Sequence, residues 1–123
     1  MSAKILVVDD SPTMRRIIIN ALNKIGYSDI GEASNGKEAL DTLRSEEYKL
    51  VLTDWNMPEM TGEQFVRELM QDEKLKSIPV IMVTTRGMKE DVITAVKLGV
   101  RGYIVKPFTP EVLKEKIEEV LGA

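Results

Sequence analysis

The sequence predicts an α/β fold, an open and doubly wound parallel sheet in which five strands alternate with five helices. Short apolar, β-branched runs recur at residues 5–8, 30–33, 50–52, 80–83 and 102–105. The segments between these runs carry apolar residues at helical spacing. Strand runs that alternate with helical patterns are typical of βαβ units. Five parallel strands are too few for the usual eight-stranded barrel, so we expect an open sheet covered on both faces.

The first strand and the first helix have clear local signals. Residues 5–8 are apolar at four consecutive positions, as expected of a strand that is covered on both faces. Ser11-Pro12 predicts the start of the helix, because serine caps a helix N-terminus and proline fits the first turn. An apolar stripe follows within residues 17–25, and Gly26 then predicts a left-handed C-terminal cap.

The second and third predicted helices each begin at a polar residue that is followed three positions later by Glu or Gln. This spacing is typical of a capping box, in which two side chains satisfy two backbone N–H groups reciprocally. The pairs are Asn35 with Glu38 and Thr61 with Gln64, ahead of apolar stripes within residues 39–43 and 65–70.

The fourth and fifth predicted helices have a marked end and a marked start, respectively. The fourth has a stripe within residues 92–96 and ends before Gly99, a second candidate for a left-handed cap. The fifth begins at Thr109-Pro110, which repeats the device of the first helix, and its stripe lies within residues 113–121.

Composition narrows the chemistry that is available. The chain of 123 residues has no Cys and no His, which excludes disulfides, thiolate or imidazole metal sites, and cysteine or histidine catalysis. A formal net charge of -3 disfavours nucleic acid as a direct ligand, because phosphate contacts need a basic surface. No apolar run has membrane-spanning length, and the start lacks the organisation of a signal peptide. We therefore expect one cytoplasmic domain over residues 1–123, with no membrane or nucleic-acid partner.

Polar side chains follow four of the five predicted strands. Asp9 and Asp10 follow the first strand, Asp54 the third, Thr84 the fourth and Lys106 the fifth. Taken alone, none of these residues indicates a functional site, because an aspartate can cap a helix and Lys-Pro can form a turn. Together they would meet at the edge where doubly wound sheets bind ligands. Converging carboxylates repel one another, and Mg²⁺ relieves this with oxygen coordination. With a lysine and a hydroxyl opposite, the set suits phosphoryl transfer to one of the aspartates.

These residues resemble those of the receiver domain of two-component response regulators over essentially the whole chain. The resemblance is carried by the segments LVVDDS at 6–11, TMRR at 13–16, DWNMP at 54–58, MVT at 82–84 and GYIVKPF at 102–108. The second and third of these narrow it to the chemotaxis type. The resemblance implies the flavodoxin-like strand order 2-1-3-4-5 and a single receiver domain without an output domain.

The resemblance also implies a role for each site position, with Mg²⁺ as the cofactor. Asp54 would be the phosphoacceptor; Asp10 would bind the metal directly and Asp9 mostly through water, and Asp54 and the backbone carbonyl of Asn56 would complete the metal ligands. Thr84 would be the switch hydroxyl, and Lys106, after a cis bond to Pro107, would bind phosphate.

Tyr103 would be an aromatic switch, and Arg86 and Lys116 are assigned to the switch or partner surface.

The implied function is a phosphorylation-activated switch in bacterial chemotaxis. A histidine kinase or a small donor such as acetyl phosphate would supply the phosphoryl group. The phosphorylated monomer would bind the flagellar motor switch through helix 4, strand 5 and helix 5, and a phosphatase is a further candidate partner. The protein would catalyse only its own phosphorylation and dephosphorylation. The alternative is a stand-alone receiver that acts as a phosphate sink or phosphorelay intermediate without binding the motor.

Two other classes fit the sequence less well. An aspartyl-phosphate hydrolase of the haloacid dehalogenase type would carry its nucleophile on the first strand, with a second aspartate two residues later. Here Asp54 follows the third strand, and Asn56 stands at that spacing. A flavin carrier would need a phosphate loop after the first strand, where Asp9 and Asp10 would repel a phosphate that lacks a metal.

Three side chains raise separate expectations. Enteric members of the chemotaxis type carry an acid two residues after the switch threonine, where this chain has Arg86. We predict that Arg86 reaches over the site and alters the access of hydrolytic water. Strand alternation predicts that Trp55 points away from Asp54, toward solvent. Without the resemblance, Tyr103 would be taken for an ordinary half-buried strand aromatic.

Overall fold

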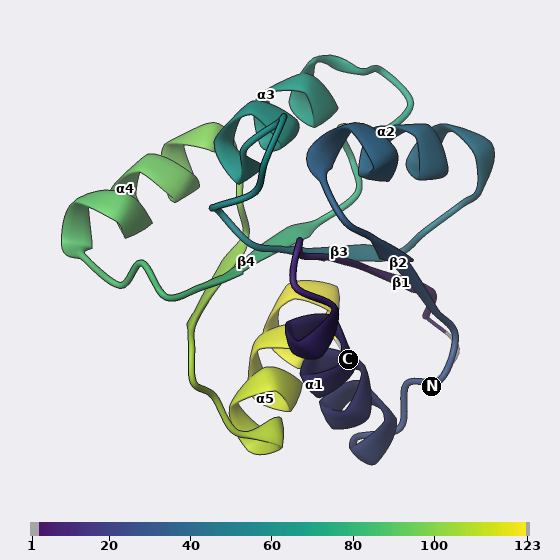
Figure 1. The fold of residues 1–123 in the computed structure, drawn as a ribbon, viewed down its shortest axis with the longest axis vertical. Helices are drawn as coiled ribbons and strands as arrows, with labels where there is room; N and C mark the ends of the chain where they lie inside the picture. Colours follow the sequence, from purple (N-terminus) through teal and green to yellow (C-terminus); the bar gives the residue numbers. More distant parts are fainter. Residues whose placement is uncertain (1–2, 123) are drawn as a thin grey trace.

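The computed structural model describes residues 3–122, and over them it confirms the predicted alternation of strands and helices (Figure 1). The third and fourth strands each end one residue later than predicted, at a threonine. The elements are β1 (Ile5–Val8), α1 (Pro12–Lys24), β2 (Ile30–Ala33), α2 (Gly36–Ser45), β3 (Leu50–Thr53), α3 (Gly62–Gln71), β4 (Val80–Thr84), α4 (Lys89–Leu98), β5 (Gly102–Val105) and α5 (Pro110–Leu121).

The five strands form one parallel sheet in the order β2-β1-β3-β4-β5, as the resemblance implies. Helices α1 and α5 cover one face, and α2, α3 and α4 cover the other (Figure 1). Because the chain moves from β1 out to β2 and returns to β3, its direction across the sheet reverses between β1 and β3. The carboxyl ends of these two central strands therefore lie at the switch point where such folds bind ligands.

The sheet divides the apolar interior into two cores, since successive strand residues point to opposite faces. In β1, Leu6 and Val8 pack under α2, α3 and α4, whereas Ile5 and Val7 pack against α1 and α5. All four are essentially inaccessible to solvent, which explains why the first strand is apolar at every position.

The helix starts agree with their sequence signals, with one difference. The two proline-containing starts, of α1 and α5, are capped as predicted. Thr61 and Gln64 form a complete capping box at α3. At α2, Asn35 accepts a hydrogen bond from the backbone N–H of Glu38, but the Glu38 carboxylate bonds to Ser34 instead of returning to Asn35. Only half of that predicted box is formed.

The helix ends and lengths follow from the same local rules. Gly26 and Gly99 adopt φ values of 103° and 109°, which confirms the two predicted left-handed caps. The longest helix, α1, has 13 residues. Among residues 3–122, none of the helices combines the length and the apolar character that crossing a membrane requires.

Candidate functional site

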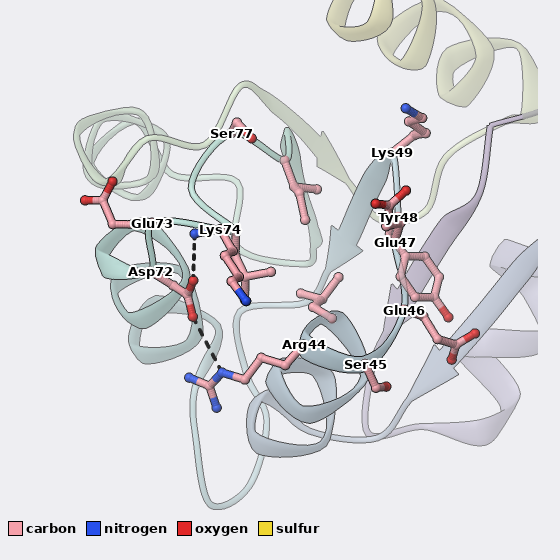
Figure 2. Close-up of a pocket in the computed structure, with 13 residues that line it drawn as sticks. Arg44, Ser45, Glu46, Glu47, Tyr48, Lys49, Asp72, Glu73, Lys74 and Ser77 are labelled. Carbon is pink, nitrogen blue, oxygen red and sulfur yellow. Dashed lines mark hydrogen bonds and ion pairs between the residues drawn. The ribbon is translucent and has the colours of Figure 1, made fainter.

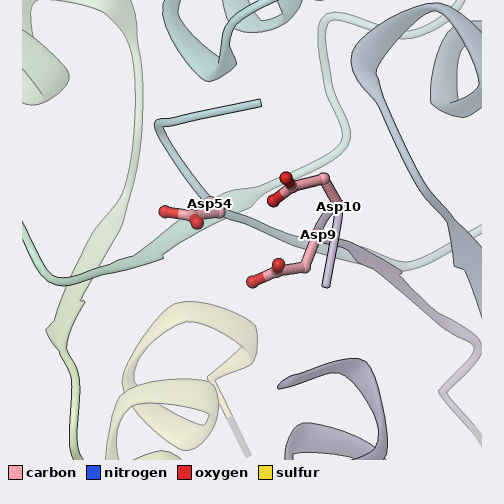
Figure 3. A group of neighbouring side chains, drawn as sticks. All are labelled: Asp9, Asp10 and Asp54. Carbon is pink, nitrogen blue, oxygen red and sulfur yellow. The ribbon is translucent and has the colours of Figure 1, made fainter. Parts of the chain in front are cut away.

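Three carboxylates meet at the carboxyl ends of the neighbouring strands β1 and β3. Asp9, Asp10 and Asp54 each place one carboxylate oxygen within 4.8 Å of the other two. Figure 3 shows the three side chains turned toward a common space. Asp9 is 1% exposed and Asp54 is 8% exposed, whereas Asp10 lies at the surface. The structure therefore brings together the three acids that the sequence singled out.

Lys106 supplies the positive charge of the site from the other side. Its Nζ lies 2.8 Å from Oδ2 of Asp9 and 3.4 Å from Oδ2 of Asp54, and its side chain is 9% exposed. The peptide bond to Pro107 is cis, as expected. Two buried carboxylates thus share one buried ammonium group, which is the arrangement that makes buried acids tolerable.

Further hydrogen bonds hold the two buried acids in place. Oδ1 of Asp9 accepts the backbone N–H of Ser11 at 2.9 Å, and Oδ1 of Asp54 accepts that of Trp55 at 2.7 Å. Both oxygens of Asp9 are thus engaged, whereas the Asp10 carboxylate makes no hydrogen bond or ion pair to any of residues 3–122. This geometry is compatible with the predicted direct role of Asp10 and the water-mediated role of Asp9.

Arg15 supports the site in a way that sequence analysis missed. Its Nη1 donates to the backbone carbonyl of Asp9 at 2.5 Å, and its Nε pairs with Oε1 of Glu32 at 2.9 Å. Because Glu32 belongs to β2, the guanidinium ties the backbone that carries the acids to the neighbouring strand. Arg15 lies in one of the segments that carry the resemblance, but its partner is 17 positions away, so no local signal indicated this contact.

Thr84 and Tyr103 both contact the main chain of Arg86. The hydroxyl of Thr84, which is fully buried, accepts the backbone N–H of Arg86 at 3.3 Å. The hydroxyl of half-buried Tyr103 donates to the carbonyl oxygen of Arg86. Burial raises the pKa of Tyr103, and the nearby Asp91 carboxylate raises it further. The two predicted switch residues are thus connected through a single peptide segment.

The side chain of Arg86 contacts Trp55 and Asp91. Its guanidinium is 4.5 Å from the centre of the Trp55 ring, and Nη2 pairs with Oδ1 of Asp91 at 2.9 Å. Within residues 3–122, it makes no hydrogen bond or ion pair to the three acids of the site. The predicted effect of Arg86 on hydrolytic water stays a prediction.

The expectation that Trp55 faces solvent is wrong. Trp55 is 5% exposed and belongs to the core beneath α2, α3 and α4. Strand alternation no longer applies to it, because β3 ends at Thr53 and Trp55 lies in the following loop. There its carbonyl oxygen accepts the N–H of Gly62, the first residue of α3, at 2.7 Å. Packing of the ring into this core, not the strand pattern, therefore sets its direction.

The remaining predicted positions are Asn56 and Lys116. Asn56 is an exposed residue of the loop after β3, and the metal-binding role of its carbonyl stays a prediction. Lys116 lies on α5, where its Nζ is 3.7 Å from Oε2 of Glu119. Exposed apolar side chains lie on or beside α4, β5 and α5, namely Met88, Ile93, Val96, Val105 and Val112.

A hollow of about 1010 Å³ lies at the opposite edge of the sheet and shares no residue with the acids. The segments that precede β3 and β4 line it (Figure 2). Arg44 Nε lies 3.5 Å from Oδ2 of Asp72, and the N–H of Lys74 donates to the other oxygen of Asp72. Acids and bases both line it, so the lining favours neither an anionic nor a cationic ligand.

The chemistry of the acidic cluster fits a hard divalent cation. Carboxylate oxygens, together with a nearby backbone carbonyl, are the ligands that Mg²⁺ prefers, and Mg²⁺ retains several of its waters. The absence of Cys and His from the chain removes the softer ligands that would favour zinc or copper. The donor set and the spacing of the oxygens therefore fit the metal that the resemblance implies.

Comparisons with known proteins agree with this site. Residues 5–118 match the response regulator receiver domain family. The chain is 58% identical over 97% of its length to a Chemotaxis protein CheY homolog of Campylobacter jejuni, of which it covers 92%. It is also 58% identical to the Chemotaxis protein CheY1 of Helicobacter pylori, with 97% of each chain covered.

A solved structure shows the same fold. The crystal structure of the chemotaxis protein CheY4 of Vibrio cholerae superposes with a TM-score of 0.90 at 35% identity, covering 98% of this chain and 100% of the other. Fold, acidic edge and sequence relatives lead to one assignment: the chain belongs to the response regulator receiver family and is a CheY-like chemotaxis response regulator.

Proposed function

We propose that the protein is a phosphorylation-activated switch that acts in the cytoplasm, accepts a phosphoryl group on Asp54 and then binds the flagellar motor switch through α4, β5 and α5. A histidine kinase would be the physiological donor. The observation that carries the proposal is the position of Lys106, whose ammonium group contacts both Asp9 and Asp54 beside the exposed Asp10. Their proximity supports a site in which Asp54 would be the nucleophile, Lys106 the fixed cation and the carboxylates hard oxygen ligands.

The chemistry is a transfer of one phosphoryl group. An oxygen of the Asp54 carboxylate forms a bond to phosphorus while the donor's P–N or P–O bond breaks, and the leaving group keeps the electron pair. The ammonium group of Lys106 and the hydroxyl of Thr84 can stabilise the negative charge on the phosphoryl oxygens. Hydrolysis reverses the modification, because water adds to phosphorus, the bond to Asp54 breaks and inorganic phosphate leaves.

The metal belongs to the same proposal. Asp10, Asp54 and the carbonyl of Asn56 would hold Mg²⁺ directly, and Asp9 would act through water. When bound, Mg²⁺ neutralises negative charge on the carboxylates and on the phosphoryl oxygens. The residues of the chain orient the acceptor, since the Trp55 N–H and Lys106 fix the two oxygens of Asp54.

The output surface is supported by its exposed apolar groups. Met88 and Val96 at α4, Val105 on β5 and Val112 on α5 are all large apolar side chains that face solvent. Lys116 lies on the same helix as Val112 and adds a positive charge. Apolar side chains with a neighbouring cation suit an amphipathic peptide that also carries acids.

Intact-mass measurement after brief incubation with Mg²⁺ and acetyl phosphate tests the transfer. We expect one phosphoryl adduct on the parent, none on Asp54→Asn and none when Mg²⁺ is chelated. Asp41→Asn, which changes an exposed aspartate on α2, is the matched control and should be modified like the parent. An adduct on Asp54→Asn, or none on the parent, would contradict the proposal.

A binding measurement tests the output. We expect a purified motor switch protein to bind the beryllofluoride-loaded parent more tightly than the unloaded parent, and Val96→Glu to weaken this binding while leaving the mass adduct unchanged. A parent that is phosphorylated but binds no more tightly would contradict the output half of the proposal and favour the phosphate-sink function.

A further inference from the structure

Three side chains from separate segments form a compact group beside the acceptor, which we call the Arg86 cluster: Trp55, Arg86 and Asp91. The guanidinium of Arg86 lies 4.5 Å from the centre of the Trp55 ring, within the range of a cation–π interaction. The same guanidinium pairs with Asp91 in the first turn of α4 at 2.9 Å. Trp55 is buried and the side chain of Asp91 is 15% exposed, whereas the side chain of Arg86 itself is 40% exposed.

The side chain of Arg86 helps to hold the backbone segment to which Thr84 and Tyr103 are hydrogen-bonded. The N–H of Arg86 donates to Thr84, and its carbonyl accepts the hydroxyl of Tyr103. The residues between β4 and α4 lie outside both elements, and the last of them, Met88, accepts the first helical hydrogen bonds of α4. The contacts of the guanidinium with Trp55 and Asp91 therefore limit where this backbone segment can lie.

The cluster also connects the acceptor with the output surface. The backbone N–H of Trp55 donates to Oδ1 of Asp54 at 2.7 Å, so a change at that carboxylate bears directly on the residue whose ring supports Arg86. On the other side, Asp91 belongs to α4, whose N-cap residue Met88 makes no side-chain capping hydrogen bond. The ion pair with Arg86 thus links this end of α4 to the segment that follows β4.

We propose that Arg86 is a positioning residue that transmits the state of Asp54 to α4 through its simultaneous contacts with Trp55 and Asp91. The inference rests on the proposed phosphorylation of Asp54 and deepens it by naming the side chains that carry the signal. A guanidinium suits this task because it is planar, it can stack on a ring and it can still donate in its plane to a carboxylate. A lysine can pair with Asp91 but cannot stack in the same way.

Amide chemical shifts measured by NMR, with and without beryllofluoride and Mg²⁺, test the transmission. In the parent, we expect shifts at residues 54–56 and along α4. In Arg86→Ala, the shifts at 54–56 should persist while those of α4 fall to less than about half of the parent's, because the coupling between the sites is weakened. Arg86→Lys and Asp91→Asn should show intermediate losses. Glu90→Gln, a neighbouring exposed acid outside the cluster, should behave like the parent.

Fluorescence of Trp55, the only tryptophan, tests the cluster without any phosphoryl mimic. Removal of the guanidinium in Arg86→Ala should expose one face of the ring and raise its quenching by acrylamide, whereas Glu90→Gln should leave quenching unchanged. Unchanged quenching in Arg86→Ala would contradict the stacking on which the inference depends.

The outcomes separate this inference from the proposed function. If the parent shows no shifts at 54–56, both are contradicted, since Asp54 does not bind the mimic. If the parent responds at 54–56 and Arg86→Ala transmits the change to α4 in full, only the role of Arg86 is contradicted. Loss of α4 shifts in Arg86→Ala and Asp91→Asn, with normal shifts at 54–56, supports it.

Discussion

Helices α3 and α4 lie in the same layer and have 10 residues each, yet they are attached to the sheet very differently. Helix α3 buries Phe65, Val66 and Leu69 and begins with a complete capping box. Helix α4 fully buries only Ala95, and its N-cap residue makes no side-chain capping bond. The helix that supports Asp54 is firmly attached, whereas the helix at the proposed output surface is held by few contacts and can change its position at low cost.

The start of α3 lies against the backbone of Asp54. A Cβ added to Gly62 would lie 2.3 Å from the carbonyl oxygen of Asp54 and 2.8 Å from Cα of Trp55. No comparable backbone contact attaches the start of α4, where a Cβ on Gly87 would meet only the side chain of Val105. The contrast assigns rigidity to the side of the site that would orient the proposed nucleophile, and mobility to the side that would report its state.

Core truncations should reveal the contrast most strongly. Phe65→Ala removes a side chain that is 0% exposed, and we expect the free energy of unfolding to fall by about 3–5 kcal/mol. Val96→Ala removes methyl groups from a residue of α4 that is 61% exposed, and it should change that free energy by less than about 0.5 kcal/mol. Urea unfolding measures both, and equal losses would show that α4 is packed as firmly as α3.

Glycine substitutions should sharpen the same comparison at the two helix starts. Gly62→Ala forces a methyl group against backbone, and we expect it to destabilise the protein by about 1–3 kcal/mol. Gly87→Ala meets the exposed side chain of Val105 at 3.2 Å, which can turn aside, so its effect should be smaller than about 1 kcal/mol. Urea unfolding again measures the difference, and a larger cost at Gly87 would overturn the proposed division.

Local signals were sufficient to predict most of the fold and the acidic edge of the site. The starts of α1 and α5 follow from a hydroxyl residue and a proline, and the meeting of Asp9 with Asp54 follows from strand polarity. The positions of Trp55 and Arg86 could not be predicted, because they contact each other across 31 positions and neither lies in a strand. Their mutual packing depends on the finished tertiary structure, which no periodicity describes.

A capping side chain added at the start of α4 tests whether the missing cap is what leaves this helix weakly attached. Met88 occupies the N-cap position with extended backbone angles but cannot accept a hydrogen bond there. Met88→Ser supplies a hydroxyl for the first turn and should raise the free energy of unfolding by about 0.5–1 kcal/mol. Thr61→Ala at the start of α3 should have the opposite sign and a similar size. If Met88→Ser leaves the free energy of unfolding unchanged, other contacts already fix this helix start.

The titration of Tyr103 should show the smallest effect. Burial raises the pKa of Tyr103 above its ordinary value of 10.0, the Asp91 carboxylate raises it further, and the Arg86 guanidinium lowers it. Because the folded state holds the proton more tightly, this contribution to stability is complete below about pH 10 and is lost as pH rises through the folded-state pKa. Asp91→Asn should therefore lower the pKa of Tyr103.

Tyrosinate absorbance as a function of pH measures this shift. Subtracting the titration curve of Tyr103→Phe leaves the contribution of Tyr103 without that of the other two tyrosines. Glu90→Gln should leave the titration of Tyr103 unchanged. An unaltered midpoint in Asp91→Asn would mean that this carboxylate does not act on the hydroxyl, and that α4 is even less connected to β5 than the contacts indicate.

The ion pair between Lys106 and Asp9 joins residues 97 positions apart, and this separation bears on how the protein is made. A ribosome completes the central strands and all three acids long before it adds β5, the edge strand that precedes the lysine. The acids are therefore synthesised well before the cation that neutralises them in the folded protein. The complete site exists only after nearly the whole chain has emerged, so an unfinished or truncated product would lack the lysine that the proposed phosphoryl transfer requires.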